Sequence, residues 1–480
     1  MSATTVAIIG GGFSGTVAAI RLLTSSQNGG PSLPFGSRVV LIESGRPGQG
    51  LAFRQGPEFW RLNVPAAKMS AFDERPADFV EWARRRDADV SGDDYLPRSW
   101  YGEYLADRLA HAKQRSPRWL KFEHVRARAT GLRVEDGAAY IALSNGTTLE
   151  ADRVLLALGN APVANPLPGA PEAIADAWNL DWMEELPTYV PRVLLVGTGL
   201  TMIDIALAIA EQRPDARMFA ISRHGLLPRP HEESYGKVAR FDAVKLLGRG
   251  PLSLRLRRFR AYVASVAGQG DWRSALEVVR EAMPTLWRAT THRTRRRFLR
   301  HLRAYWDVHR HRAPGATLER IAALRAKKRL DVAAGRLVEA RRIKGGIVAT
   351  WRPRGEDKLR EELVDAVVNV TGPDGNPSRS NCPLVQSLIE QGLCVSDYIG
   401  TGWGTDPDGR MFDAIGNASQ VLYYVGPLLR AQHWEATAVP ELRTHVRRTT
   451  VAIADSLASS AGSTLRKFAA PLFRREASLF

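Results

Sequence analysis

The sequence predicts an α/β protein with two Rossmann-like dinucleotide-binding domains and a helical insertion, because one pattern occurs twice. A short apolar strand at residues 6–9 runs into the glycine loop 10–15, and another at 193–196 runs into the loop 197–199. Each loop is followed by an apolar periodicity of helical spacing and then by a further apolar strand, which is the order of a βαβ unit. A chain of 480 residues has room for two such domains.

The composition excludes several classes of protein. The chain is 44% hydrophobic and 24% charged, which is ordinary for a globular protein. Its two cysteines, Cys382 and Cys394, form no Cys-x-x-Cys pair, so a disulfide scaffold, a zinc ribbon and a dithiol relay are excluded and no metal site is expected. The N-terminus has no basic segment and no run reaches about 20 apolar residues, which predicts a cytoplasmic protein without a membrane span.

The net charge of +17 comes from 67 Lys and Arg against 50 Asp and Glu. Many arginines lie between residues 255 and 312, where they alternate with apolar residues at helical spacing. We interpret them as the solvated faces of amphipathic helices, with steering of anionic cofactors or of an acidic substrate as the alternative. A protein that senses nucleotides or binds nucleic acid is a further alternative, but charge alone predicts no specific nucleic-acid site.

The remaining elements follow from periodicity and from proline and glycine signals. Glycine-flanked strand ends at 155–160 and 368–373 fit the places where the chain crosses between domains, and a proline-rich connector follows the first of them at 160–168. Helices are predicted at 16–23, 76–86, 99–115 and 201–212 and through most of 232–330, and strands at 38–42, 122–158, 217–221, 337–351 and 363–370.

The first glycine loop has the spacing of a dinucleotide site. Gly10 makes the tight turn, Gly12 lets the backbone approach a pyrophosphate, and Gly15 lets the helix pack on the strand. Phe13 and Ser14 lie at the helix N-terminus that would hold the negative charge. The next strand ends at Glu43 and Ser44, where an acid accepts hydrogen bonds from a ribose diol.

The second loop ends differently. It reads Gly197, Thr198, Gly199, Leu200 and Thr201, with a methionine in the place of the third glycine. Its second strand ends in Ser222, Arg223 and His224, and an arginine there suits the 2′-phosphate of NADPH, which an acid would repel. The two strand ends therefore predict FAD at the first loop and NADPH at the second, with hydride passing from nicotinamide to flavin.

These assignments give the predicted domain boundaries. The FAD-binding domain comprises residues 1–165 plus 365–450, and the NADPH-binding domain comprises 190–364 with a basic helical insertion at 232–330. Residues 451–480 are predicted to form a peripheral helix and C-terminal tail. The glycine-flanked strand ends add Gly159, Thr371 and Gly372 to the cofactor-binding candidates.

The sequence resembles two-dinucleotide-binding flavoproteins, the FAD/NAD(P)-binding protein family of the YdhS type, which is related to N-hydroxylating flavin monooxygenases. The segments that carry this resemblance are 61–72, 96–102, 197–204, 222–225, 306–312 and 434–443. It implies that segments 63–69 and 434–437 line the flavin, although Trp434 as a core aromatic is an equal alternative. Further cofactor-binding candidates by this resemblance are Gly50, Asn63, Met69, Arg98, Gly426, Trp434 and Thr437. Asn63, Lys68 and Glu435 are the catalytic candidates, and Lys68 or Arg98 would suit an acidic substrate.

The sequence departs from known branches at several points. Pro373 stands where siderophore N-hydroxylases carry an aromatic residue, the Phe-x-Gly-x-x-x-His stretch of Baeyer–Villiger enzymes is missing, and residues 424–427 lack the aspartate of disulfide reductases. The resemblance implies an FAD-dependent, NADPH-consuming monooxygenase that uses O₂ to oxygenate an amine or amino acid through a flavin C4a-hydroperoxide. An NADPH-dependent flavin reductase or electron-transfer oxidoreductase is the alternative, and a homo-oligomer is left open.

Overall fold

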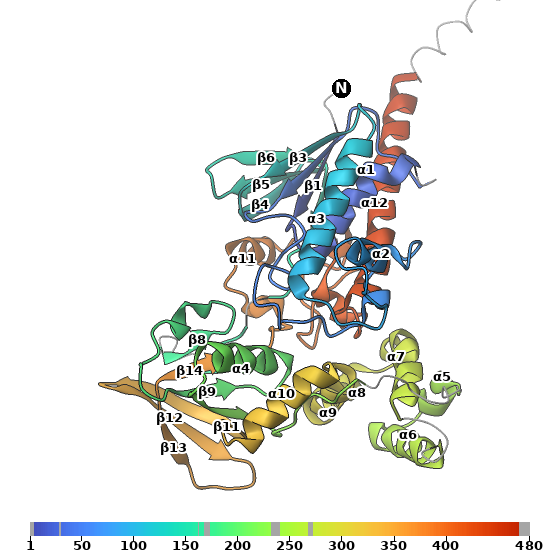
Figure 1. The fold of residues 1–480 in the computed structure, drawn as a ribbon. Coiled ribbons are helices and arrows are strands. Elements are labelled where there is room, and N and C mark those ends of the chain that lie inside the picture. The colour runs from blue at the N-terminus through green and yellow to red at the C-terminus, as the bar shows by residue number, and fades with distance from the viewer. Residues whose placement is uncertain are drawn as a thin grey trace, which may run out of the picture. The chain divides into compact units, whose positions relative to one another are not determined.

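The computed structural model describes residues 4–27, 30–161, 163–167, 173–231, 241–266 and 272–469. It divides into two compact units, Met1–Asn160 with Gly375–Phe480, and Ala161–Asp374, so the second is inserted into the first (Figure 1). Residues 232–240 and 267–271 of the predicted helical insertion, and 470–480 of the predicted tail, lie outside the described residues. Among the described residues, no helix is long and apolar enough to cross a membrane.

The first unit is built on a six-stranded sheet in the order β15-β16-β7-β1-β2-β3. All neighbours are parallel except the β15–β16 pair. The central strands are apolar runs buried on both faces, as parallel strands covered by helices require. The strands are β1 (Thr5–Ile9), β2 (Arg38–Ile42), β3 (Lys121–Val125), β7 (Arg153–Leu156), β15 (Arg410–Phe412) and β16 (Ala418–Tyr424).

Helices and a small second sheet complete this unit. The helix α1 packs against β1 and β2 and also against α3 and α12, and α11 packs on β4 (Figure 1). The helices are α1 (Phe13–Thr24), α2 (Asp78–Arg84), α3 (Arg98–Arg115), α11 (Pro383–Glu390) and α12 (Val439–Ala469). The small antiparallel sheet consists of β4 (Ala129–Glu135), β5 (Ala138–Leu143) and β6 (Thr148–Ala151).

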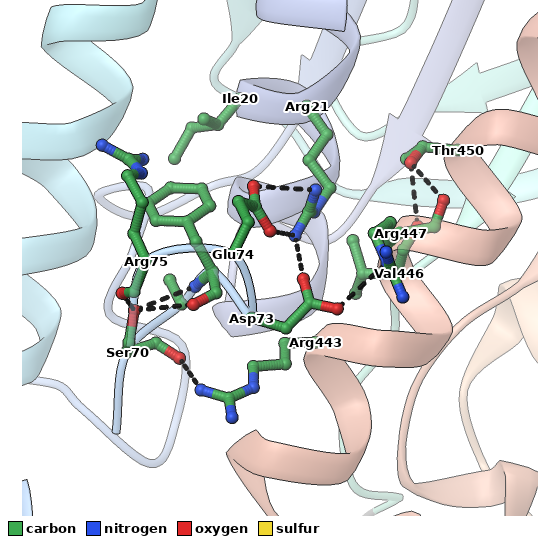
Figure 2. A network of polar contacts seen from close by, with 12 residues as sticks. Ile20, Arg21, Ser70, Asp73, Glu74, Arg75, Arg443, Val446, Arg447 and Thr450 are labelled. Carbon is green, nitrogen blue, oxygen red and sulfur yellow. Dashed lines mark hydrogen bonds and ion pairs between the residues drawn. The ribbon is translucent and has the colours of Figure 1, made fainter. Parts of the chain in front are cut away.

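A network of ion pairs fastens α12 to the N-terminal half of this unit (Figure 2). Asp73 accepts from Arg21 of α1 at 2.9 Å and from Arg447 of α12 at 3.0 Å, so one carboxylate bridges two helices. Arg21 also pairs with Glu74 at 3.0 Å, and Arg443 donates to the Ser70 carbonyl at 2.9 Å. The loop around residues 70–75 is therefore held between both helices.

The second unit contains a seven-stranded sheet in the order β13-β12-β11-β10-β9-β14-β8. The strands from β11 through β8 are parallel, whereas β11, β12 and β13 form an antiparallel meander. The strands are β8 (Ala175–Asp176), β9 (Arg192–Val196), β10 (Arg217–Ser222), β11 (Leu330–Ile343), β12 (Gly346–Pro353), β13 (Arg360–Val364) and β14 (Ala366–Asn369).

The helices of the second unit fall into two groups. The apolar helix α4 (Leu200–Gln212) follows the second glycine loop and contacts α10 (Gly315–Ala326), which leads into β11. The others form the predicted basic helical region: α5 (Ala243–Leu247), α6 (Leu252–Val266), α7 (Trp272–Arg288), α8 (His292–His301) and α9 (Arg303–Arg310).

The predicted fold class is confirmed, whereas two predicted strands and the predicted extent of the first domain are corrected. Strand 363–370 is split, because β13 lies at the edge of the second sheet while β14 pairs with β9 in its centre. Residues 161–165 and 365–374, which were predicted for the first domain, therefore belong to the second unit. The strand predicted at 337–351 is two strands, and the first begins at Leu330. The helix predicted from residue 451 is present, since residues 451–469 continue α12, and its Ile453 and Leu457 are buried in the first unit's core.

Candidate functional site

The first glycine loop has space for an added Cβ at Gly12 and none at Gly10 or Gly15. Gly10 has φ +102°, and a Cβ there would lie 2.4 Å from the Ala157 carbonyl oxygen at the end of β7. A Cβ on Gly15 would lie 1.8 Å from the Gly10 carbonyl oxygen, so α1 and β1 touch there. At Gly12, with φ −71°, the nearest atom to an added Cβ is 3.7 Å away. A ligand can therefore approach the backbone at Gly12.

The start of α1 is suited to an anion at this point. Its first turn carries no acidic side chain, and Phe13 and Ser14 supply backbone N–H groups at the positive end of the helix. The Thr16 hydroxyl donates to the Gly11 carbonyl at 2.9 Å and accepts from the Gly48 amide at 2.9 Å. These two bonds hold the loop after β2 against the glycine loop. The N-terminus of α1 beside them is a suitable site for a pyrophosphate.

Glu43 ends β2 beside the glycine loop, as predicted. Its Oε2 accepts from the Gly11 amide and its Oε1 from the Gly45 amide, both at 2.8 Å, while the Ser44 hydroxyl lies 3.4 Å from Oε1. Each carboxylate oxygen can accept more than one bond, so capacity remains for a ribose diol. Gly50, with φ +50°, comes close to Gly12, where a Cβ would be 3.0 Å from the Gly12 Cα.

The other first-unit candidates before residue 160 lie in different environments. Met69 is buried at the end of a short 3₁₀ turn, Asn63 is half-buried, and Lys68 is exposed without an ion pair among the described residues. The Arg98 Nε donates to the Arg61 carbonyl at 3.0 Å. Gly159 has φ +69° and open space around its Cα.

The C-terminal candidates are largely enclosed within the first unit. Gly426 has φ +154°, and a Cβ there would lie 2.6 Å from the Tyr424 hydroxyl, so a side chain is not accommodated. Trp434 is buried with the Arg430 guanidinium 4.2 Å from its ring centroid, which favours a core aromatic. Glu435 is also buried, whereas Thr437 is half-exposed.

The second glycine loop repeats the geometry of the first. Gly197 has φ +126°, and a Cβ there would lie 2.4 Å from the Val370 carbonyl oxygen, just as Gly10 abuts Ala157. Gly199 precedes α4 with φ −86°, and an added Cβ would meet nothing within 4 Å. Leu200 and Thr201 begin α4, whose first turn again carries no acidic side chain. This loop therefore also leaves an open approach to a helix N-terminus.

A chain of hydroxyl groups connects this loop to the end of β10. The Thr198 hydroxyl donates to the Leu226 carbonyl at 2.6 Å, so the Ser222 hydroxyl, 2.8 Å away, donates to Thr198. Ser222 in turn accepts from the Gly225 amide at 3.1 Å. These bonds hold the turn that carries Arg223 against the glycine loop.

Positive charge gathers at this turn. Arg223 is exposed, and the Arg354 guanidinium donates to His224 Nδ1 at 2.9 Å. Since a guanidinium can only donate, His224 accepts at Nδ1 and its ring is neutral. Burial and the charges of Arg354 and Arg223 lower the pKa of His224. Arg354 has no signal in the sequence, because only the pairing of β11 with β12 brings it beside His224.

The predicted boundary at 365 placed Thr371 and Gly372 in the first unit. The structure places them in the second unit, beside the second glycine loop. The Asn369 Oδ1 accepts from the Thr371 amide at 3.2 Å and from its hydroxyl at 2.7 Å. The Asn369 amide group donates to the Ala164 carbonyl at 2.9 Å, so this buried residue fixes both connecting segments of the second unit. In the sequence, Asn369 is recognisable only as a polar residue at the end of an apolar strand.

Thiol chemistry has no support in the structure. Cys394 is buried, and burial raises the pKa of its thiol to about 12, so the thiolate is not formed at neutral pH. Cys382 and Cys394 are both free thiols. Among the described residues, no cluster of His, Cys, Asp or Glu could hold a metal ion.

Comparisons with known proteins agree with this geometry. Residues 7–161 match the model of the FAD-NAD(P)-binding family. The fold is similar to that of reduced ornithine hydroxylase from Pseudomonas aeruginosa, with 15% identity, a TM-score of 0.63, and coverage of 95% of this chain and 100% of that chain. No curated protein matches the sequence.

Two further solved structures are similar to this chain over nearly its whole length. For L-lysine 6-monooxygenase from Pseudomonas syringae the identity is 15% and the TM-score 0.66, with 95% of this chain and 100% of that chain covered. For the ornithine N-hydroxylase of Kutzneria sp. 744, solved with reduced FAD, NADP⁺ and L-ornithine, the values are 16% and 0.60, with 94% and 99% covered. The chain therefore has the two-nucleotide-domain flavoprotein fold of these hydroxylases.

Proposed function

We propose that this protein is an FAD-dependent, NADPH-consuming monooxygenase that oxygenates the nitrogen of an amine or amino acid with O₂. The observation that carries the proposal is the opposite charge at two equivalent strand ends. Glu43 ends the strand beside the first glycine loop, whereas Arg223 and Arg354 lie at the end of the strand beside the second. A carboxylate accepts from a ribose diol, and two guanidinium groups bind a 2′-phosphate, so FAD suits the first unit and NADPH the second.

The residues of this chain bind and orient the two nucleotides. The Glu43 carboxylate would accept from the FAD ribose, and the N–H groups after Gly12 would donate to its pyrophosphate. The N–H groups after Gly199 would do the same for NADPH, with Arg223 on the 2′-phosphate. When bound, FAD accepts hydride and activates O₂, and the protein supplies positioning and the exclusion of water.

Three finer assignments belong to the same proposal. The likeness to lysine and ornithine hydroxylases supports an amine substrate, and Lys68, an exposed cation without an ion pair among the described residues, would suit the carboxylate of an amino acid. Asn63 and Glu435 are kept as catalytic candidates beside the flavin. We also propose membership of the YdhS-type subfamily and a cytoplasmic location, where NADPH is available.

The test is the fate of electrons taken from NADPH. The flavin-loaded protein is reduced anaerobically with NADPH, mixed with O₂, and followed by absorbance while peroxide and hydroxylamine products are measured over a panel of diamines and basic amino acids. A monooxygenase shows a spectral species that is neither reduced nor oxidised flavin, and one substrate lowers peroxide release while forming hydroxylamine. Immediate return of oxidised flavin with stoichiometric peroxide for every amine would contradict the proposal.

An NADPH-dependent reductase is the alternative under the same cofactor assignment. It predicts rapid electron transfer to an added acceptor and no hydroxylamine from any amine. Disulfide reduction by a protein dithiol is disfavoured, because the sequence has only two cysteines and the Cys394 thiol is buried.

A further inference from the structure

A large cavity lies within the helical region of the second unit, away from both glycine loops in the sequence. Its volume is about 1010 Å³, and residues of α5, α6, α7, α8 and α9 line it. This volume is at the upper end of the range of about 300–1,000 Å³ that small-molecule sites occupy. The sequence pattern of this region predicts solvated amphipathic helices, and no residue of either glycine loop is among the described residues that line the cavity.

Two helices line the cavity along their apolar faces. On α7, Leu276, Val279, Met283 and Leu286 follow one another at spacings of three or four residues, so they form a single stripe. A second stripe on α6 includes Leu256, Phe259 and Val263. The stripe on α7 extends about 20 Å from Trp272 to Leu286 at 1.5 Å per residue, which is long enough for an extended hydrocarbon chain.

The charged residues of the lining are all cationic. Among the described residues that line the cavity there are four arginines and no aspartate or glutamate. These arginines are Arg229, Arg255, Arg260 and Arg273, and His309 also lines the cavity. An ammonium group entering the cavity would therefore meet like charge, whereas a carboxylate would meet opposite charge.

Arg255 is a partly buried cation held by neutral groups. Its Nε donates to the Gly250 carbonyl at 2.9 Å and its guanidinium to the Thr290 hydroxyl at 3.2 Å. It forms no ion pair with a carboxylate of the described residues, and burial lowers its pKa. A guanidinium has five N–H donors and these two bonds use only two of them, so donors remain for an anion. Thr290 follows the C-terminal end of α7, so Arg255 of α6, which donates to the Thr290 hydroxyl, lies near that end of the apolar stripe.

We propose that the cavity binds a long-chain fatty carboxylate, with its hydrocarbon chain between α6 and α7 and its carboxylate at Arg255. The apolar stripes match the chain, and the cationic lining selects the sign of the head group. This site is additional to the proposed monooxygenase function. Its test measures binding alone, so failure of the oxygenation proposal leaves it standing.

The test uses calorimetric titration of the purified full chain, loaded with flavin, with dodecanoate below its micelle concentration. Dodecanoate is expected to bind with a stoichiometry of one to one. Dodecylamine and dodecanol should bind at least tenfold more weakly, because only a carboxylate carries the charge opposite to that of the arginines in the lining. Octanoate should bind more than tenfold more weakly than dodecanoate, since four buried methylene groups are lost.

Two variants with one matched control assign the site. Arg255→Gln should weaken dodecanoate at least tenfold, whereas Arg257→Gln, on the same helix but exposed and outside the lining, should change nothing. Val279→Trp should obstruct the middle of the apolar stripe on α7 and weaken dodecanoate binding at least tenfold while the circular dichroism of the protein is retained. Equal binding of dodecylamine, an unchanged affinity of Arg255→Gln, or binding to phosphatidylglycerol vesicles without binding of free dodecanoate would overturn the proposal.

Discussion

Replacing Gly12 by Ala should weaken binding of the flavin without lowering the stability of the flavin-free protein. An added Cβ would meet only the Gly50 Cα, at 3.7 Å, and the backbone φ of −71° suits any residue. The folded chain without flavin should therefore keep its stability or gain about 0.4–1 kcal/mol, because alanine restricts the unfolded chain. The methyl group would occupy the space through which a pyrophosphate reaches the helix N–H groups.

The expected loss of affinity follows from the bonds that this approach allows. Loss of one charge-assisted hydrogen bond to the pyrophosphate costs about 1.5–3 kcal/mol, which raises the Kd for FAD about 10- to 150-fold. Gly15→Ala behaves differently, since its Cβ would lie 1.8 Å from the Gly10 carbonyl oxygen. Separating α1 from β1 to make room destabilises the flavin-free protein by about 1–3 kcal/mol or more.

The assay combines titration of the flavin-free protein with FAD, followed by quenching of flavin fluorescence, and thermal unfolding of the same sample without flavin. Gly315→Ala, at the start of α10 with open space around its Cα, controls for a methyl group added elsewhere and should leave the FAD affinity unchanged. An unaltered FAD affinity in Gly12→Ala with unaltered stability would refute the assignment of this loop as the pyrophosphate site.

Three other perturbations test the remaining arguments. Arg223→Ala should raise the KM for NADPH at least tenfold and leave that for NADH nearly unchanged, as measured by steady-state NAD(P)H oxidation. Burial, with the charges of His433 and Arg448, lowers the pKa of His445 to about 4, so the unfolded state binds more protons between pH 6.5 and 4. Stability should fall by up to about 3 kcal/mol as the pH drops through this window, and less in His445→Gln, as shown by urea unfolding at several pH values. Asp73→Asn should lower the free energy of unfolding by about 1 kcal/mol, because it breaks the bridge from α1 to α12 (Figure 2).

Each of these has a matched control. Arg217, exposed at the opposite end of β10 from Arg223, should tolerate alanine without a change in either KM. His111→Gln, at an exposed position of α3, should leave the acid sensitivity as in the parent protein. Asp408→Asn removes an exposed partner of Arg448 and should cost less than about 0.5 kcal/mol. Equal effects of a variant and its control would remove the structural reason for that prediction.

The sequence was informative wherever a feature is built from neighbouring residues. Both glycine loops, the strands that enter them and the helices that leave them were predicted close to their observed bounds, because a βαβ unit is encoded in one continuous segment. The positions of Glu43 and Arg223 could be predicted for the same reason, since each directly follows a strand of its own unit.

Features that depend on distant pairing could not be predicted in this way. The buried run of β14 would fit the centre of either sheet, and only its pairing with β9 places it in the second unit. Arg354 reaches His224 through the pairing of β11 and β12. The cavity beside α6 and α7 was missed because an amphipathic helix has the same sequence pattern whether its apolar face is packed or lines a space.

The insertion of Ala161–Asp374 into the first unit has a consequence for biosynthesis. A ribosome completes β7 and then the whole second unit before it makes β16, the strand that pairs with β7. The second unit is continuous in the chain and can fold during translation, whereas the first sheet keeps an unpaired edge until residues 418–424 emerge. The nascent chain is therefore most exposed to edge-strand aggregation during this interval, and the domain that begins synthesis is the last to finish folding.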